Sequence, residues 1–440
     1  MKKKVRVKKL SVWLLIFSMS FAFLLPGNAA SAKQKKQEQK GNSYPIVLCH
    51  GCAGWGRNEN IGTLAFGAKY YWGGKVDLQK ELTKKEYKTY TAEVGPFSSN
   101  WDRACELYAQ IKGGKVDYGE AHSKRFGHER YGRTYKGFLP EWGTEDEKGK
   151  ISKIHLISHS QGGQTVRVLS QLLSEGSKEE KRASGDKVSP LFKGGKSWIS
   201  SITTLSAPHD GTTLADVKGA NKLAAIALAT VGGNLGNFPC TDAIYDLKLD
   251  QFGLKREKGE SLTQYIKKCL NSSMWTNGKD NCVYDLSTNG AVELNRWVKA
   301  QKDVYYFSWA CKSTMEKPLS ILDFQIADPD LMGDKGIYNL QFAAQAAFIG
   351  SYHRRNYSYE IPIINKDWWP NDGFVNTISE NGPKYGSNDK IVDYSGKPQI
   401  GKWNFMGVMD IDHADIVGIY WDRVLDFYLD TVQMLRKLPG

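Results

Sequence analysis

The sequence contains little proline, 14 residues in 440, and no long proline- or serine-rich stretch that would link separate domains. No segment repeats with a period of about 20–50 residues, which argues against a solenoid or a propeller. Beyond the N-terminus, no apolar run is long enough to cross a bilayer. With 24% charged and 41% hydrophobic residues, the composition excludes disorder, collagen and coiled coil as the main state.

Cysteine is also scarce and odd in number, with seven residues, too few for a disulfide scaffold. Cys49 and Cys52 have C-x-x-C spacing, but they end an apolar strand and open no helix, so we expect no redox role there. Cys269 and Cys282 flank a turn-rich segment and are the best candidates for a structural disulfide.

The N-terminus has the pattern of a secretory signal peptide. Six Lys and Arg lie within the first nine residues, an apolar run follows over 10–25, and small residues lead to Ala32. We expect cleavage after about Ala32, a flexible basic leader over 33–43, secretion, and no stable insertion into a membrane. No basic–aromatic module is present, so a nucleic acid is not an expected partner.

The remaining chain, 44–440, reads as one α/β domain with a mainly parallel central sheet. Residues 97–150 are rich in Gly, His, Tyr and charge and resemble an insertion. Residues 212–236 hold an apolar helical stretch between glycines, which indicates a buried helix or a lid. The expected strands are 44–49, 87–94, 153–157, 198–205 and 303–309.

One motif between a strand and a helix carries chemistry. Ser158-His159-Ser160-Gln161-Gly162 is a Gly-x-Ser-x-Gly nucleophile elbow with serine in the first position. A serine hydroxyl becomes a good nucleophile when a sharp turn presents it to a base. The oxyanion then needs two N–H donors, and the backbone groups of Gln161 and Cys52 are the candidates.

The order Ser, acid, His that is typical of such enzymes leaves His353 and His413 as possible bases. His413 is favoured because it lies in an acidic loop just before a C-terminal helical stretch. Asp372 is the preferred acid, since it follows Trp368-Trp369-Pro370 in a loop that leads to apolar residues. The competing acids, Asp410, Asp412 and Asp415, lie very close to His413 in sequence.

Together these motifs resemble those of the secreted triacylglycerol lipases of thermophilic bacilli and staphylococci. The resemblance implies an α/β-hydrolase fold with a helical lid, and Ser160, Asp372 and His413 as the triad. It departs at Cys52, where the family has an aromatic residue, and at Ser158, where it has alanine. The matching segments are 45–51, 54–57, 71–74, 94–96, 98–106, 132–135, 159–165, 208–214, 248–251, 284–287, 371–373 and 412–413.

The resemblance also implies two metal sites. A structural zinc would be held by two His and two Asp in a closed tetrahedron, which would attach the 97–150 insertion to a later segment. A calcium site is the less secure expectation, because the family's Asp-Pro turn is altered here. The zinc ligands would be Asp102, His122, His128 and Asp280, and the calcium ligands Gly336, Asp415 and Asp422.

The sequence therefore predicts a secreted lipase that acts on triacylglycerols at an oil–water interface. A phospholipase or a short-chain carboxylesterase of the same fold is the alternative. A catalytically dead surface-binding protein is disfavoured by the intact Ser160, Asp372 and His413. A metalloenzyme is disfavoured because no H-E-x-x-H motif or open three-ligand set is present.

Overall fold

In a computed structural model, the described residues are 41–217, 245–255, 257, 259–260, 264, 267–269, 271–276, 278–316, 324–332, 337–355 and 361–440. The predicted signal peptide over 1–32 and most of the predicted lid lie outside these residues. Within them, no helix is long and apolar enough to span a bilayer.

The centre of the structure is a seven-stranded sheet in the order β10-β11-β7-β6-β5-β1-β2, and every neighbouring pair is parallel. The five expected strands are all present, with ends that differ by a few residues. Two further strands, β10 and β11, were not expected. The strands are β1 Ile46–Cys49, β2 Thr89–Ala92, β5 Ile154–His159, β6 Ile199–Leu205, β7 Tyr305–Cys311, β10 Ile391–Asp393 and β11 Trp403–Met409.

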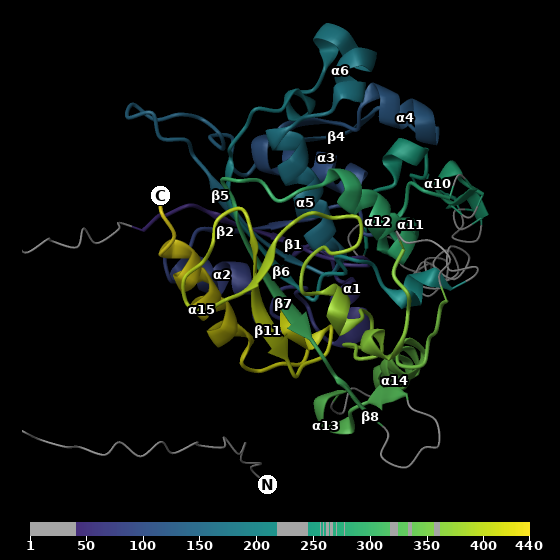
Figure 1. The fold of residues 1–440 in the computed structure, drawn as a ribbon. Coiled ribbons are helices and arrows are strands. Elements are labelled where there is room, and N and C mark those ends of the chain that lie inside the picture. The colour runs from purple at the N-terminus through teal and green to yellow at the C-terminus, as the bar shows by residue number, and fades with distance from the viewer. Residues whose placement is uncertain are drawn as a thin grey trace, which may run out of the picture. The chain divides into compact units, whose positions relative to one another are not determined.

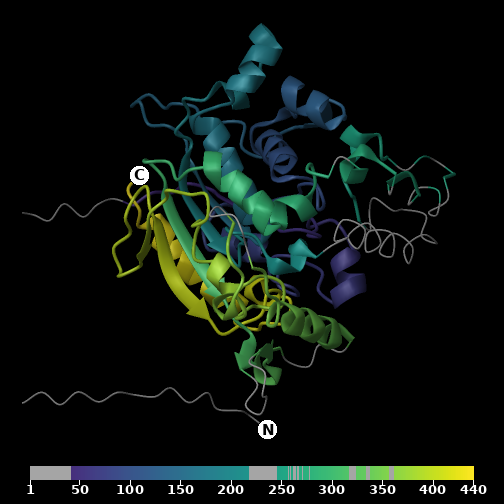
Figure 2. The ribbon, with the colours of Figure 1, turned by 45° about the vertical axis from the view of Figure 1, so that its right-hand side comes forward.

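Helices cover both faces of this sheet, so the central strands β1, β5 and β6 are buried along their whole length. Alternate residues of β1 serve different layers: Leu48 packs toward α2 and α15, whereas Val47 packs toward α3 and α5. Figure 1 and the turned view in Figure 2 show these helices on opposite sides of the sheet. The layers are α2 Leu78–Lys84 with α15 Val424–Arg436, and α3 Asn100–Lys112 with α5 Gln161–Ser174.

The segment predicted as an insertion, 97–150, begins with α3, which packs against α5 and belongs to the helical layer. After α3 the chain leaves that layer and forms a small antiparallel pair, β3 with β4, around a short helix, α4. These elements are β3 Gly114–Asp117, α4 Glu120–Phe126 and β4 Tyr131–Tyr135.

The remaining described elements surround the carboxyl ends of the strands or lie at the surface. They are α1 Ile61–Phe66, α6 Lys178–Ser184, α10 Ser273–Thr276, α11 Cys282–Leu286, α12 Thr288–Trp297, β8 Thr314–Glu316, β9 Gln325–Ala327, α13 Pro329–Met332 and α14 Ile337–Ile349. Ligands of parallel α/β sheets bind where the strands end, so this rim is where a site is expected.

Candidate active site

Ser160 stands at the turn between β5 and α5, as the motif predicts. Its backbone has φ 54° and ψ −132°, a left-handed conformation that non-glycine residues rarely adopt. Such strain at a strand-to-helix turn is the signature of a nucleophile elbow, because it exposes the side chain above the sheet.

Small residues after the turn allow the start of α5 to lie close to the ends of the neighbouring strands β1 and β6. A Cβ on Gly163 would lie 2.5 Å from Cβ of Ala207, just after β6, and one on Gly162 would overlap the carbonyl oxygen of Cys49 in β1. Ser158, which replaces the first glycine of the motif, is buried and donates a hydrogen bond to the Thr203 carbonyl at 3.2 Å. Serine therefore fits that position without disturbing the turn.

Asp372 and His413 meet at the same rim from two different loops. His413 Nδ1 lies 2.6 Å from Asp372 Oδ2, and the His413 backbone N–H donates to the Asp372 carbonyl at 3.0 Å. The other carboxylate oxygen accepts the backbone N–H groups of Phe374, at 2.9 Å, and Val375, at 2.7 Å. Asp372 is fully buried, so these donors replace the water that its charge has lost.

Two of the alternatives proposed from the sequence, His353 and Asp412, have other partners. His353 is exposed and packs its ring 4.9 Å from that of Trp369. Asp412 turns its carboxylate to the backbone N–H groups of Ala414 and Asp415, at 3.0 and 2.9 Å. This carboxylate shapes the loop that carries the histidine, whereas Asp372 holds the imidazole.

Ser206 completes the group around the imidazole and was not found from the sequence. It directly follows β6, has a left-handed φ of 53°, donates its hydroxyl to Asp372 Oδ2, and lies 3.2 Å from His413 Nδ1. Its only sequence signal is its place at the end of a buried strand beside the elbow strand.

The loop after β1, expected to supply an oxyanion donor, lies directly against the elbow. A Cβ on Gly51 would be 2.5 Å from Cβ of Ser160, so the loop backbone passes close to the hydroxyl. Tyr71 accepts the Gly51 N–H at 3.0 Å and bonds His159 Nδ1 at 2.5 Å. The N–H of Gln161 is the first of α5, where helical N–H groups have no partner within the helix.

Arg103 holds this loop through hydrogen bonds to its backbone, a role that the sequence did not predict. Its buried guanidinium donates to the carbonyls of His50, at 2.5 Å, and Gly95, at 2.7 Å, while Nε donates to Thr165 at 2.9 Å. An arginine on α3 thus sets the position of the segment that contains Cys52. It lies next to Asp102 in the sequence, so α3 serves both this loop and the cluster described below.

Ser160 and His413 open into one cavity of about 570 Å³. Its walls are mostly apolar, a composition that suits an acyl chain better than a polar substrate. The described start of the predicted lid contributes Thr212, Leu214 and Ala215 to this lining, and the rest of the 212–236 segment lies outside the described residues. The apolar lining includes Phe97, Leu214, Val283, Leu286, Phe342, Phe374, Val417 and Ile419.

The expected disulfide between Cys269 and Cys282 was wrong. Cys282 carries a free thiol and forms no disulfide with Cys269. It lines the cavity beside Cys52, and the thiols of Cys52 and Cys282 hydrogen-bond each other. The two segments meet because Ala53 and Cys282 donate their backbone N–H groups to Pro96 and Phe97. The small Cys52 side chain leaves this wall of the cavity to be shared by both thiols.

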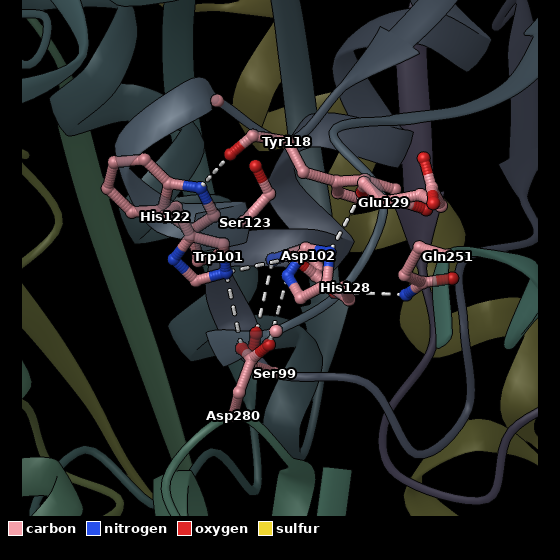
Figure 3. Close-up of polar contacts among 12 residues, drawn as sticks. Ser99, Trp101, Asp102, Tyr118, His122, Ser123, His128, Glu129, Gln251 and Asp280 are labelled. Atoms are coloured by element: carbon pink, nitrogen blue, oxygen red, sulfur yellow. Dashed lines mark hydrogen bonds and ion pairs between the residues drawn. The ribbon is translucent and has the colours of Figure 1, made fainter. Parts of the chain in front are cut away.

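The four residues expected to bind zinc come together in the interior (Figure 3). One possible ligand atom from each lies within 4.8 Å of the others. His122 Nε2 is 3.1 Å from Asp102 Oδ1 and 3.3 Å from Asp280 Oδ1, and His128 Nε2 is 3.2 Å from Asp280 Oδ2. His128 Nε2 and the Asp280 oxygens are buried but form no well-oriented hydrogen bond. Buried polar atoms without hydrogen-bond partners are consistent with a metal ion bound between them.

Surrounding groups hold the ligand atoms in this arrangement. His128 Nδ1 bonds the Glu129 carbonyl at 2.9 Å, which leaves Nε2 for the cluster, and Gln251 donates to the outer oxygen of Asp102 at 2.9 Å (Figure 3). Burial disfavours a charged His122, but the carboxylates of Asp280 and Asp102 outweigh it and raise the pKa of this imidazole to about 10. The centre of the cluster thus favours positive charge, which a divalent ion supplies.

The residues expected to bind calcium are only partly described. Asp415 is buried at the start of a short turn after His413, and Asp422 is exposed. Gly336 lies outside the described residues. The calcium site therefore stays a prediction.

Comparisons with known proteins agree on one family. Residues 42–431 match the family model described as "Lipase-like, C-terminal domain". A lipase of Staphylococcus epidermidis is 38% identical over 392 residues, which cover 88% of this chain and 52% of that protein. The chain thus spans about half the length of the staphylococcal relatives it matches.

Two solved structures resemble the whole described fold. EstA from Clostridium botulinum is 49% identical, with a TM-score of 0.80, over 92% of this chain and 90% of that one. Lipase 1 from Pelosinus fermentans is 50% identical, with a TM-score of 0.78, over 90% of this chain and 99% of that one.

Proposed function

The chain belongs to the lipase-like family, and on this premise we propose that it is a secreted lipase that hydrolyses the carboxylic ester bonds of triacylglycerols. The observation that carries the proposal is the apolar cavity into which Ser160 and His413 both open. An apolar wall beside a nucleophile selects long acyl chains from water, as lipid hydrolysis requires. Secretion rests on the signal-peptide pattern over 1–32.

In this proposal, Ser160 Oγ attacks the ester carbonyl while His413 Nε2 takes its proton and later passes it to the leaving alcohol. Asp372 holds the imidazole with Nδ1–H toward its carboxylate and stabilises the imidazolium that forms. The N–H groups of Cys52 and Gln161 receive the oxyanion. Water then attacks the acyl-enzyme with His413 as base, and the free fatty acid leaves.

Substrate preference tests the proposal and separates it from its alternatives. We expect the purified protein to release fatty acid from emulsified triacylglycerol faster than from phosphatidylcholine vesicles or p-nitrophenyl acetate. A series of p-nitrophenyl esters of increasing chain length should show activity with long acyl chains. Preference for phosphatidylcholine would instead identify a phospholipase, and activity confined to short esters would identify a carboxylesterase.

We further propose that Asp102, His122, His128 and Asp280 bind one zinc ion. Two imidazoles and two carboxylates form a donor set that zinc accepts, and four protein ligands leave no open position for catalysis. The ion would join α3, the α4 segment and the residues before α11. A calcium ion near Asp415 stays a prediction.

Removal of the metal should therefore lower the thermal stability of the protein but leave its activity at moderate temperature. Treatment with a strong chelator is expected to reduce the melting temperature by about 5–10 °C, because an ion bound only by the folded state stabilises it. Activity at moderate temperature should persist, since Ser160 and His413 are not ligands. Differential scanning fluorimetry and ester hydrolysis, measured on the same sample, check both parts.

The control for this experiment is a pair of aspartate variants. Asp280→Asn should lose the metal and the heat resistance, whereas Asp393→Asn, which changes an exposed residue of β10, should keep both. Elemental analysis of protein purified without chelator should give about one zinc per chain. Protein that contains almost no zinc, or an Asp280→Asn variant that keeps its metal, would contradict the site.

A further inference from the structure

Glu380 is a fully buried carboxyl group that the mechanism above does not use. It follows the short helix Thr377–Ser379, and its side chain reaches the end of β7. There Oε2 accepts the backbone N–H of Cys311 at 2.5 Å. The other oxygen, Oε1, is equally buried, and no N–H or O–H donor of the described residues bonds it.

The group that faces Glu380 is the carboxylate of Asp372, which contacts it side chain to side chain. The one other titratable group beside it is the thiol of Cys311, and no described lysine or arginine offsets its charge. Two ionised carboxylates cannot share a buried site without a cation, so one of them holds a proton. Both oxygens of Asp372 already accept N–H or O–H donors, whereas Glu380 Oε1 has none, so we place the proton on Glu380.

We propose that Glu380 is a positioning residue of the active site: its carboxyl group stays protonated and donates a hydrogen bond from Oε1 to the Asp372 carboxylate. The proposal rests on the catalytic role proposed above for Asp372. Burial and the charge of Asp372 together raise the pKa of Glu380 well above its usual range, in agreement with this assignment.

The consequence is that Asp372 is oriented from two sides. Ser206 and His413 bond one oxygen, and the Glu380 hydroxyl supplies a further donor that steadies the carboxylate against β7. A further donor limits rotation of the carboxylate and so keeps Oδ2 directed at His413 Nδ1. Loss of this donor should loosen the carboxylate and reduce kcat.

Two variants test whether Asp372 needs a hydrogen-bond donor at position 380. Glu380→Gln keeps the shape, accepts the Cys311 N–H through its carbonyl oxygen, and donates an N–H to Asp372, so kcat should stay close to wild type. Glu380→Met removes the donor. It should lower kcat about tenfold, because the Asp372 carboxylate is then held less firmly.

A stability measurement locates the proton without reference to catalysis. In the unfolded chain this glutamic acid ionises near its ordinary pKa of about 4.5, whereas in the folded protein it ionises only at a much higher pH. It therefore stabilises the fold at low pH, and this contribution is lost as the pH rises. Above about pH 4.5, the unfolding constant of wild type should therefore increase relative to that of Glu380→Gln, by up to about tenfold per pH unit. Denaturant titrations from pH 4 to 8 give this ratio.

If the ratio of the two unfolding constants, wild type to Glu380→Gln, stayed constant across this pH range, Glu380 would be ionised in the folded protein and the proposal would be overturned. So would a Glu380→Gln variant as impaired as Glu380→Met, or a Glu380→Met variant with the wild-type rate. If Glu380→Met does not fold, the Gln variant and the unfolding ratio still decide. An active Ser160→Ala variant would refute the proposed function, while the ratio would still locate the proton.

Discussion

Replacement of Ser160 by alanine should reduce kcat for ester hydrolysis by about four to six orders of magnitude, the loss typical when the nucleophile of such a triad is removed. The elbow holds Ser160 in a strained turn, and Ser160 lines the same cavity as His413. Alanine keeps the small volume at this turn, so the melting temperature should change little. Initial rates with a p-nitrophenyl ester and a thermal melt measure the two quantities.

The matched control is Ser170→Ala, which removes a buried hydroxyl from the same helix, α5, far from the cavity. Its rate should stay within about twofold of wild type, as is usual for residues that contact neither substrate nor oxyanion. A Ser160→Ala protein that retained more than a few per cent of the wild-type rate would show that another group attacks the ester.

Replacement of Asp372 by asparagine should have the second largest effect, a fall in kcat of about four orders of magnitude. Asparagine has almost the same shape, but its amide carries no charge and can present N–H to Nδ1 of His413. The imidazole would then hold its proton on the wrong nitrogen and could not accept one from Ser160. KM should change little, because Asp372 is fully buried and does not reach the substrate.

Asp412→Asn is the control, since Asp412 was a competing acid in the sequence and lies next to the same histidine. Its carboxylate accepts backbone N–H groups of the loop, a role that an amide oxygen can also fill. We expect a small loss of rate from Asp412→Asn. Similar losses from both variants would mean that Asp372 has no special part in catalysis.

The sequence predicted the core of the fold because its central strands carry a strong local signal. Strands such as Ile46–Cys49 are buried on both faces and read as continuous apolar runs. The α/β-hydrolase fold implied by the resemblance is confirmed by the solved structures that match the chain. The strands β10 and β11 escaped prediction, because β10 has only three residues and Asn404 and Gly407 interrupt the apolar pattern of β11.

The site was predictable where one short segment carries the chemistry and not where packing creates it. The elbow around Ser160 is a local motif, whereas Ser206 and Glu380 reach Asp372 from residues 166 and 8 positions away. Nothing near either residue in the sequence marks it as different from an ordinary serine or glutamate. The cysteine expectation failed for the same reason: Cys282 meets Cys52 through contacts with the 96–97 segment, not through its neighbours in sequence.

The most direct test of the central claim is to label the native protein with a fluorophosphonate, which reacts only with an activated serine, and to map the adduct by peptide mass spectrometry. The proposed function predicts one adduct per chain on Ser160, formed rapidly in wild type and far more slowly in Asp372→Asn. The absence of an adduct, or an adduct on any other residue, would contradict the assignment and would favour a binding protein that keeps the fold without the activity.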